Sequence, residues 1–186
     1  MPVAAELELV SPGIWIWHLY DPAVKADLFS TAIQTGSGIY LVDPVPLAAN
    51  AISELSDLGS IAGIVVTNEN HERAAEDFAC QFRVQRYARS RVGPGLNAVP
   101  IDGAPAGEMA VYCDADGGTL IIGDALINFE PYGFALLPPK YCLSAKVMRK
   151  WLPTLLDYSF ERILFAHGTP ILFGARQRLA QLLEKY

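Results

Sequence analysis

The sequence has few of the residues that mark several large classes of protein. Charged side chains make up only 18% of its 186 residues, and 14 basic against 20 acidic side chains give a net charge of −6. A nucleic-acid-binding surface needs clustered Lys and Arg to neutralise phosphates. Only the segment Arg83–Arg91 approaches such a cluster, and its arginines are interleaved with Val, Tyr and Ala as on an ordinary solvated face. We therefore expect no nucleic-acid partner.

Cysteines and long apolar runs are equally sparse. Cys80, Cys113 and Cys142 lie far apart and form no Cys-x-x-Cys pair, so neither a disulfide framework nor a sulfur-bound zinc is indicated. No apolar run approaches the roughly 20 residues that span a bilayer, and the N-terminus lacks a basic segment followed by an apolar one. These absences predict a cytoplasmic protein without a membrane partner.

Hydrophobic residues, in contrast, are abundant at 52% of the chain, enough for a substantial core. Strand and helix patterns alternate throughout, without a repeat or a low-complexity linker, so we expect one mixed α/β domain over residues 1–186. Pro153 should kink or end the helix in which it lies, and Asp114–Gly118 should form a hairpin turn. The expected strands are 13–19, 28–34, 39–42, 61–66, 82–87, 109–113, 119–122 and 162–165, and the expected helices are 46–58, 73–80, 143–157 and 174–185.

One segment carries the clearest chemical signal. Residues 64–73 read I-V-V-T-N-E-N-H-E-R, a hydrophobic strand that runs directly into polar residues. This segment resembles the metallo-β-lactamase superfamily, in which a strand ending in Thr is followed by His-x-His-x-Asp-His, whose side chains bind one or two metal ions. On this resemblance Asn68 and Asn70 replace the first two His, Glu72 replaces the Asp and Arg73 replaces the last His.

Other segments resemble the same superfamily, in the family's order. Gly36–Pro44 resembles the strand whose terminal Asp, here Asp43, supports the metal loop from behind. Thr119–Leu126 resembles the strand that ends in Gly-Asp, whose Asp, here Asp124, bridges the two metals.

Towards the C-terminus, Arg162–Pro170 resembles the family's last strand, which ends in a metal-binding His, here His167. At Gly103–Gly107 the family has a further metal-binding His, and this chain has Ala104. The resemblance, most of all to hydroxyacylglutathione hydrolases, implies a four-layer αββα sandwich. It also implies that Asp43, the 67–73 loop, Asp124 and His167 converge at one edge.

The family's first metal site would use positions 68, 70 and 104, none of which is a His in this chain. The amide oxygen of Asn is a poor substitute for imidazole on zinc, so we expect no metal at this first site and no dinuclear zinc centre. At the second site, Glu72 could join Asp124 and His167 to hold one zinc, iron or manganese ion.

Arg73 opposes a metal at this second site, because a guanidinium stays protonated and repels a dication. We therefore also predict that Arg73 pairs with Asp124, and with Glu72, in place of the ion. The remaining positive charge would then make the cleft suitable for a small anionic molecule.

Two classes of function follow from this resemblance. One is a hydrolase, as in the enzymes of this family that cleave thioesters, lactams, lactones or phosphodiesters. The other is a hydrolase-like binding or regulatory protein that keeps the cleft without the chemistry, because a fold does not determine a function. In both, the expected cleft residues are Asp43, Asn68, Asn70, His71 and Arg73, with His71 as a non-ligand that hydrogen-bonds at the helix start.

Overall fold

The computed structural model describes residues 3–4 and 6–186. Strands and helices alternate along this part of the chain, and none of its helices has the length and apolar character that a membrane crossing requires. The strands are β1 (Glu8–Ser11), β2 (Ile14–Asp21), β3 (Ala26–Thr35), β4 (Gly38–Val42), β5 (Ile61–Val65), β6 (Arg86–Tyr87), β7 (Asn97–Pro100), β8 (Met109–Cys113), β9 (Thr119–Ile122), β10 (Leu126–Phe129), β11 (Gly133–Leu136) and β12 (Arg162–Phe165). The helices are α1 (Ala49–Leu58), α2 (Ala75–Phe82), α3 (Ala145–Trp151) and α4 (Ala175–Leu183), with 3-10 turns η1 (Ala115–Gly117), η2 (Pro139–Tyr141) and η3 (Leu152–Asp157).

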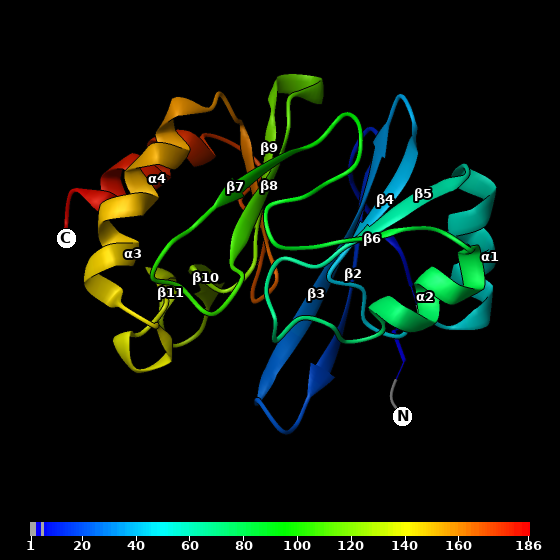
Figure 1. The fold of residues 1–186 in the computed structure, drawn as a ribbon, viewed down its shortest axis with the longest axis horizontal. Helices are drawn as coiled ribbons and strands as arrows, with labels where there is room; N and C mark the ends of the chain where they lie inside the picture. Colours follow the sequence, from blue (N-terminus) through cyan, green and yellow to red (C-terminus); the bar gives the residue numbers. More distant parts are fainter. Residues whose placement is uncertain (1–2, 5) are drawn as a thin grey trace.

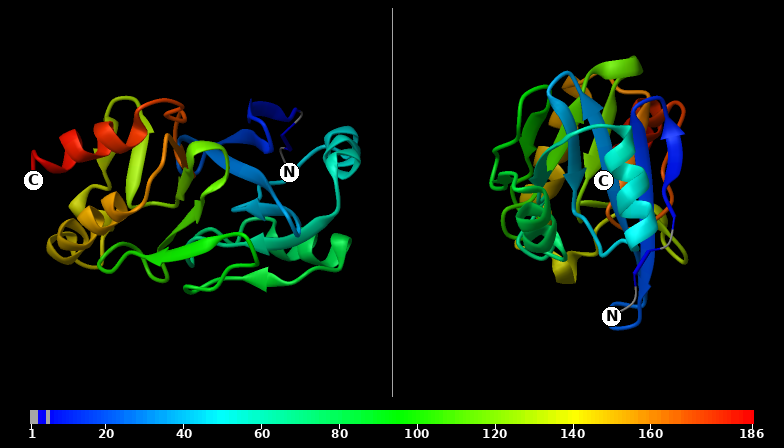
Figure 2. Two further views of the ribbon diagram at one scale, coloured as in Figure 1. Left: turned by 90° about the horizontal axis from the view of Figure 1, so that it is seen from above. Right: turned by 90° about the vertical axis from the view of Figure 1, so that its right-hand side faces the viewer.

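Two main sheets form the centre of the molecule. One has six strands in the order β1 to β6, and the other has four in the order β12-β9-β8-β7. Strands β10 and β11 form a separate hairpin. Helices α1 and α2 lie outside the first sheet, and α3 and α4 lie outside the second (Figures 1 and 2).

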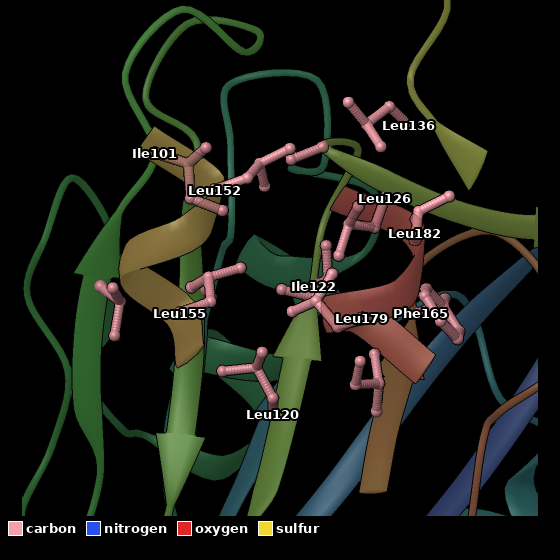
Figure 3. Close-up of a cluster of buried hydrophobic side chains, with 14 of the residues drawn as sticks. Ile101, Leu120, Ile122, Leu126, Leu136, Leu152, Leu155, Phe165, Leu179 and Leu182 are labelled. Atoms are coloured by element: carbon pink, nitrogen blue, oxygen red, sulfur yellow. The ribbon is translucent and has the colours of Figure 1, made fainter. Parts of the chain in front are cut away.

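Three hydrophobic clusters correspond to the three interfaces between these four layers. Along β4, Leu41 packs with α1 and α2, whereas its neighbour Tyr40 packs with the other sheet. Along β9, Ile121 faces the first sheet, while Leu120 and Ile122 pack against α3 and α4 (Figure 3). Successive side chains of a strand point to opposite faces, so both central sheets are covered on both sides. The predicted αββα sandwich is confirmed.

Several details differ from the sequence predictions. The expected strand at 82–87 is wrong at its start, because α2 continues to Phe82, which packs into the core beside Phe78. The left-handed backbone of Arg83 then ends the helix, so only Arg86–Tyr87 pairs with β5. Strands β1, β7, β10 and β11 were not predicted. Pro153 does end an α-helix, since α3 stops at Trp151 and continues as a 3-10 turn.

The topology places four chain segments at the same edge of the sandwich. Strands β4 and β5 are parallel neighbours, and so are β9 and β12. Parallel strands end at the same edge of a sheet, and polar residues follow each of these ends. Backbone hydrogen bonds from Asp43 to Val65 and from Phe29 to Ala166 connect the loops.

Candidate metal centre

Asp43 is the buried anchor of the site, and only 2% of its surface is exposed. Its backbone is left-handed, with φ at 48°, which an Asp tolerates better than most residues. Oδ1 accepts a hydrogen bond from the Thr67 amide at 2.8 Å, and Oδ2 lies 2.5 Å from the Thr67 hydroxyl and 2.8 Å from Nδ1 of His71. The Asp43 carboxylate therefore fixes the orientation of the His71 ring.

The other ring nitrogen of His71 faces two further predicted site residues. Its Nε2 lies 3.2 Å from Oδ1 of Asp124, and Nε2 of His167 lies 3.2 Å from the same oxygen. The three ligand atoms all lie within 4.8 Å of one another. Two imidazoles and a carboxylate suit iron, manganese or zinc. A His that bonds a carboxylate through its second nitrogen is also the usual arrangement around a metal, so this donor set fits a divalent ion.

The pKa of each of these three side chains depends on burial and on hydrogen bonds to its neighbours. Burial disfavours the charged form of His71, but the charge of Asp43 and the hydrogen bonds to Asp124 and Asp43 raise the pKa of His71 to about 9. Burial also acts against ionised Asp124, yet hydrogen bonds to His167 and His71 hold its pKa well below the usual range. Burial lowers the pKa of His167, which keeps that ring neutral. A metal on these three atoms would therefore have to displace the Nε2 proton of His71, and the neutral His167 ring would have to carry its own proton on Nδ1.

A second polar group lies directly beside Asp124. The amide nitrogen of Asn68 donates to Oε2 of Glu108 at 2.7 Å and to Oδ2 of Asp124 at 3.0 Å. Oε1 of Glu108 accepts the backbone amides of Asp124 and Ala125 at 2.9 and 3.0 Å. Burial and the nearby Asp124 charge raise the pKa of Glu108 to about 8. Glu108 was not identified from the sequence, where its one signal is a carboxylate immediately before an apolar strand.

The triad lies at the floor of a cleft of about 820 Å³. The β2–β3 hairpin forms one wall, with Val24, Lys25 and Leu28, and the β10–β11 hairpin contributes another. Most of the lining is apolar, and the polar groups converge at the floor. Pockets of this composition are typical of small-molecule sites. The remaining lining residues are Asp21, Ala23, Ala26, Asn70, His71, Arg73, Pro105, Asp124, Ile127, Phe129, Glu130, Pro131, Tyr132, Leu137, Pro138, Tyr141 and His167.

Comparisons with known proteins agree with this arrangement. A family profile described as "Metallo-beta-lactamase superfamily" matches residues 7–93. The TMB-1 structure is 14% identical with a TM-score of 0.70, over 100% of this chain and 99% of that one. A metallo-beta-lactamase from Pontibacter korlensis is 13% identical with a TM-score of 0.72, over 97% of this chain and 99% of that one. The chain has the metallo-β-lactamase fold.

A similar protein from Erythrobacter litoralis, also described as a metallo-beta-lactamase, is 12% identical with a TM-score of 0.68, over 97% of this chain and 92% of that one. No curated protein matches the chain in sequence. The predicted resemblance is thus confirmed for the fold and, over residues 7–93, for the superfamily profile, while the hydroxyacylglutathione-hydrolase-like subtype stays a prediction. The predicted convergence is also confirmed, because Asp43, the 67–73 loop, Asp124 and His167 meet at one edge of the metallo-β-lactamase fold.

Arg73 does not play its predicted role. Its guanidinium donates to the backbone carbonyls of Phe29 at 2.7 Å, Asp43 at 3.0 Å and Ala166 at 3.5 Å. The ion pairs among the described residues include none between Arg73 and Asp124, so that prediction is wrong. A carbonyl within β3 and two carbonyls just beyond the ends of β4 and β12 accept hydrogen bonds from the guanidinium. Arg73 therefore joins the edges of the two sheets.

Glu72 also lies outside the group of converging ligand atoms. Its side chain is 54% exposed and pairs with Arg86 on β6. His71 takes the place that the sequence interpretation had given to Glu72. The left-handed backbone of Arg73, with φ at 39°, belongs to the turn that sends Glu72 outwards. At the family's first site, Asn68 bonds Glu108, Asn70 lines the cleft and Ala104 is buried in the core.

Proposed function

We propose that the protein is a hydrolase that uses one divalent metal ion, bound by His71, Asp124 and His167. One observation carries the proposal: three ligand atoms converge within 4.8 Å at the floor of the cleft. The contact of His71 with Asp43 supports it, because that contact leaves Nε2 to face the other two ligands. Zinc, iron and manganese are the candidate ions.

An ion in this position would act as a Lewis acid, polarising a carbonyl or phosphoryl oxygen and lowering the pKa of a water molecule to about 7. The protein's own residues hold the ligands in place. Asp43 accepts a hydrogen bond from Nδ1–H of His71, which selects the tautomer needed for binding. Burial lowers the pKa of His167, so its ring is neutral and one of its two nitrogens has a lone pair.

The walls of the cleft would bind the substrate. Apolar side chains such as Val24, Leu28 and Ile127 exclude water, while the charged lining is mixed, with Lys25 and Arg73 beside Asp21 and Glu130. We infer a small substrate with an apolar part and a thioester, lactam, lactone or phosphodiester bond, and an anionic group on it would have to contact Lys25. The cytoplasmic location indicated by the sparse cysteines belongs to the same proposal.

The proposal is tested by titrating chelator-treated protein with Zn²⁺, Mn²⁺ and Fe²⁺ in a calorimeter. We expect one equivalent to bind, and hydrolysis of at least one of the four substrate classes to require that ion. The variant E72Q is the matched control, because Glu72 bonds Arg86 away from the triad. A metal affinity that falls in E72Q but not in H71N would favour the ligand set inferred from the sequence.

A second candidate function is a binding protein without bound metal. It is supported by the charges in the cleft, where protonated His71 lies between ionised Asp43 and Asp124 and balances part of their charge. This alternative predicts no saturable metal binding, and ligand binding that a chelator leaves unchanged. The same calorimetric titration therefore separates the two functions.

A further inference from the structure

The amide of Asn68 lies between two buried carboxylates, beside the candidate metal centre. Its nitrogen bonds Oε2 of Glu108 and Oδ2 of Asp124, at 2.7 and 3.0 Å. The orientation of the amide is set from its other side, because Oδ1 of Asn68 accepts the backbone amide of Asn70 at 2.8 Å. Both N–H groups of Asn68 are therefore available to the carboxylates.

Glu108 in turn is built into the turn that carries Asp124. One of its oxygens accepts two consecutive backbone amides, from Asp124 and Ala125. The turn approaches so closely that a Cβ on Gly123 would lie 2.9 Å from either Glu108 oxygen and 2.5 Å from the Thr67 hydroxyl. A side chain at position 123 would displace Glu108. Glycine at this position therefore permits the contact of Glu108 with the Asp124 turn.

We propose that Asn68 and Glu108 are positioning residues that hold Asp124 as a one-oxygen metal ligand and exclude a second ion beside it. Oδ2 of Asp124 is engaged by Asn68, so only Oδ1 faces His71 and His167. The Asn68 nitrogen offers hydrogens and no lone pair to a cation. It therefore donates hydrogen bonds to two carboxyl groups at the position where a second ion would otherwise contact them. The metal-binding part of this proposal rests on the proposed function.

The first experiment uses the variants N68A and E108Q, with E72Q as the control. Each positioning variant should weaken Zn²⁺ binding about 10- to 100-fold, the usual cost of losing a group that orients a metal ligand. Both Glu108 oxygens accept hydrogen bonds, so in E108Q the new NH₂ group would face another N–H donor, either that of Asn68 or those of the backbone of Asp124 and Ala125. Because both residues act through Asp124, the double variant should lose no more affinity than the weaker-binding single variant. Additive losses would contradict this shared route.

A metal-free measurement separates this proposal from the proposed function. Proton NMR of apo protein should show a slowly exchanging ring N–H of His71, protected by Asp124. E108Q should speed that exchange at least about tenfold if Asp124 is released, since exchange tracks local opening, while E72Q should not. If wild-type protein binds no metal but E108Q speeds the exchange, the hydrolase proposal fails and the positioning role stands. Unchanged exchange in folded E108Q overturns the positioning role.

The exclusion of a second ion is tested with N68D. This change replaces the amide nitrogen with an oxygen. The new carboxylate would then lie between the carboxyl groups of Glu108 and Asp124. We expect Mn²⁺ stoichiometry to rise from one to two equivalents, because carboxylate oxygens suit that ion. A folded N68D protein that still binds a single equivalent would contradict the exclusion.

Discussion

Two neighbouring groups of polar side chains at the edge of the sandwich differ in chemistry. In one, His71, Asp124 and His167 direct ligand atoms to a common point. In the other, the Asn68 amide and the Glu108 carboxyl group form hydrogen bonds with each other and with Asp124. The difference shows that adjacent polar residues at one sheet edge can either offer converging ligand atoms or satisfy one another through hydrogen bonds.

The largest expected effect is that of H167A. His167 is neutral, so its removal leaves no unpaired buried charge and the fold should survive. Loss of one of three ligands should weaken Zn²⁺ binding more than about 100-fold, beyond the loss typical of an orienting residue. Calorimetry with a competing chelator measures this affinity. A retained affinity would show that the ion, if bound, lies elsewhere.

Metal affinity should also depend steeply on pH. The pKa of His71 is about 9 without metal, so binding near neutral pH must release its proton. The apparent affinity should rise roughly tenfold per pH unit up to about 9, as expected for release of one proton. Titrations at pH 6, 7 and 8, in buffers of different ionisation enthalpy, count the released protons. A pH-independent affinity would contradict the assignment of His71 as a ligand.

The same proton stabilises the metal-free protein. The pKa of His71 in the folded state lies above its ordinary value of 6.5. Its contribution to stability is therefore fully present below pH 6.5 and is lost as the pH rises through about 9. Thermal unfolding of apo protein should show this decline. Saturating Zn²⁺ should remove it if the metal replaces the proton.

A smaller effect is expected for D43N. Asp43 holds Nδ1 of His71, and an amide in its place presents either a donor or a weaker, uncharged acceptor. Zn²⁺ affinity should fall about 10-fold, at the lower end of the cost of losing an orienting group. The pKa of His71, measured by NMR in apo protein, should fall because Asp43 helps to raise it. Unchanged values of both quantities would refute the supporting role of Asp43.

The smallest effect on the metal centre is expected for R73K. Lysine keeps the charge but lacks the planar guanidinium that reaches three carbonyls. The free energy of unfolding should fall by about 1–3 kcal/mol, as buried carbonyls lose donors, while Zn²⁺ affinity changes little. Denaturant unfolding and calorimetry on the same samples distinguish these outcomes. A large loss of Zn²⁺ affinity with an unchanged free energy of unfolding would show that Arg73 acts on the metal site after all.

The fold could be predicted further than the site, for physical reasons. Alternating and continuous apolar runs located β2 to β5, β8, β9 and β12, and the motif order implied the sandwich. The ends of these strands placed Asp124 and His167 together. Strands β10 and β11 were missed because each has only four residues, and Asn128 in β10 and Gly133 in β11 interrupt the apolar pattern.

Inside the site, spacing alone could not decide between His71 and Glu72. That choice depends on the left-handed turn at Arg73 and on Arg86, which draws Glu72 outwards from another strand. The partners of Arg73 are backbone carbonyls, which leave no trace in the sequence. Glu108 likewise acquires its role only when β8 and β9 pair, which brings its carboxylate to the backbone of Asp124.

The central claim is that this cleft holds one divalent ion on His71, Asp124 and His167. The most direct measurement is ¹⁵N NMR of the histidine side chains during titration of apo protein with Zn²⁺. The account predicts saturation at one equivalent, with Nε2 of both His71 and His167 shifting to values of metal-bound nitrogen while the exposed His18 is unchanged. Saturation at two equivalents, or binding that leaves the His71 signal unaltered, would contradict it.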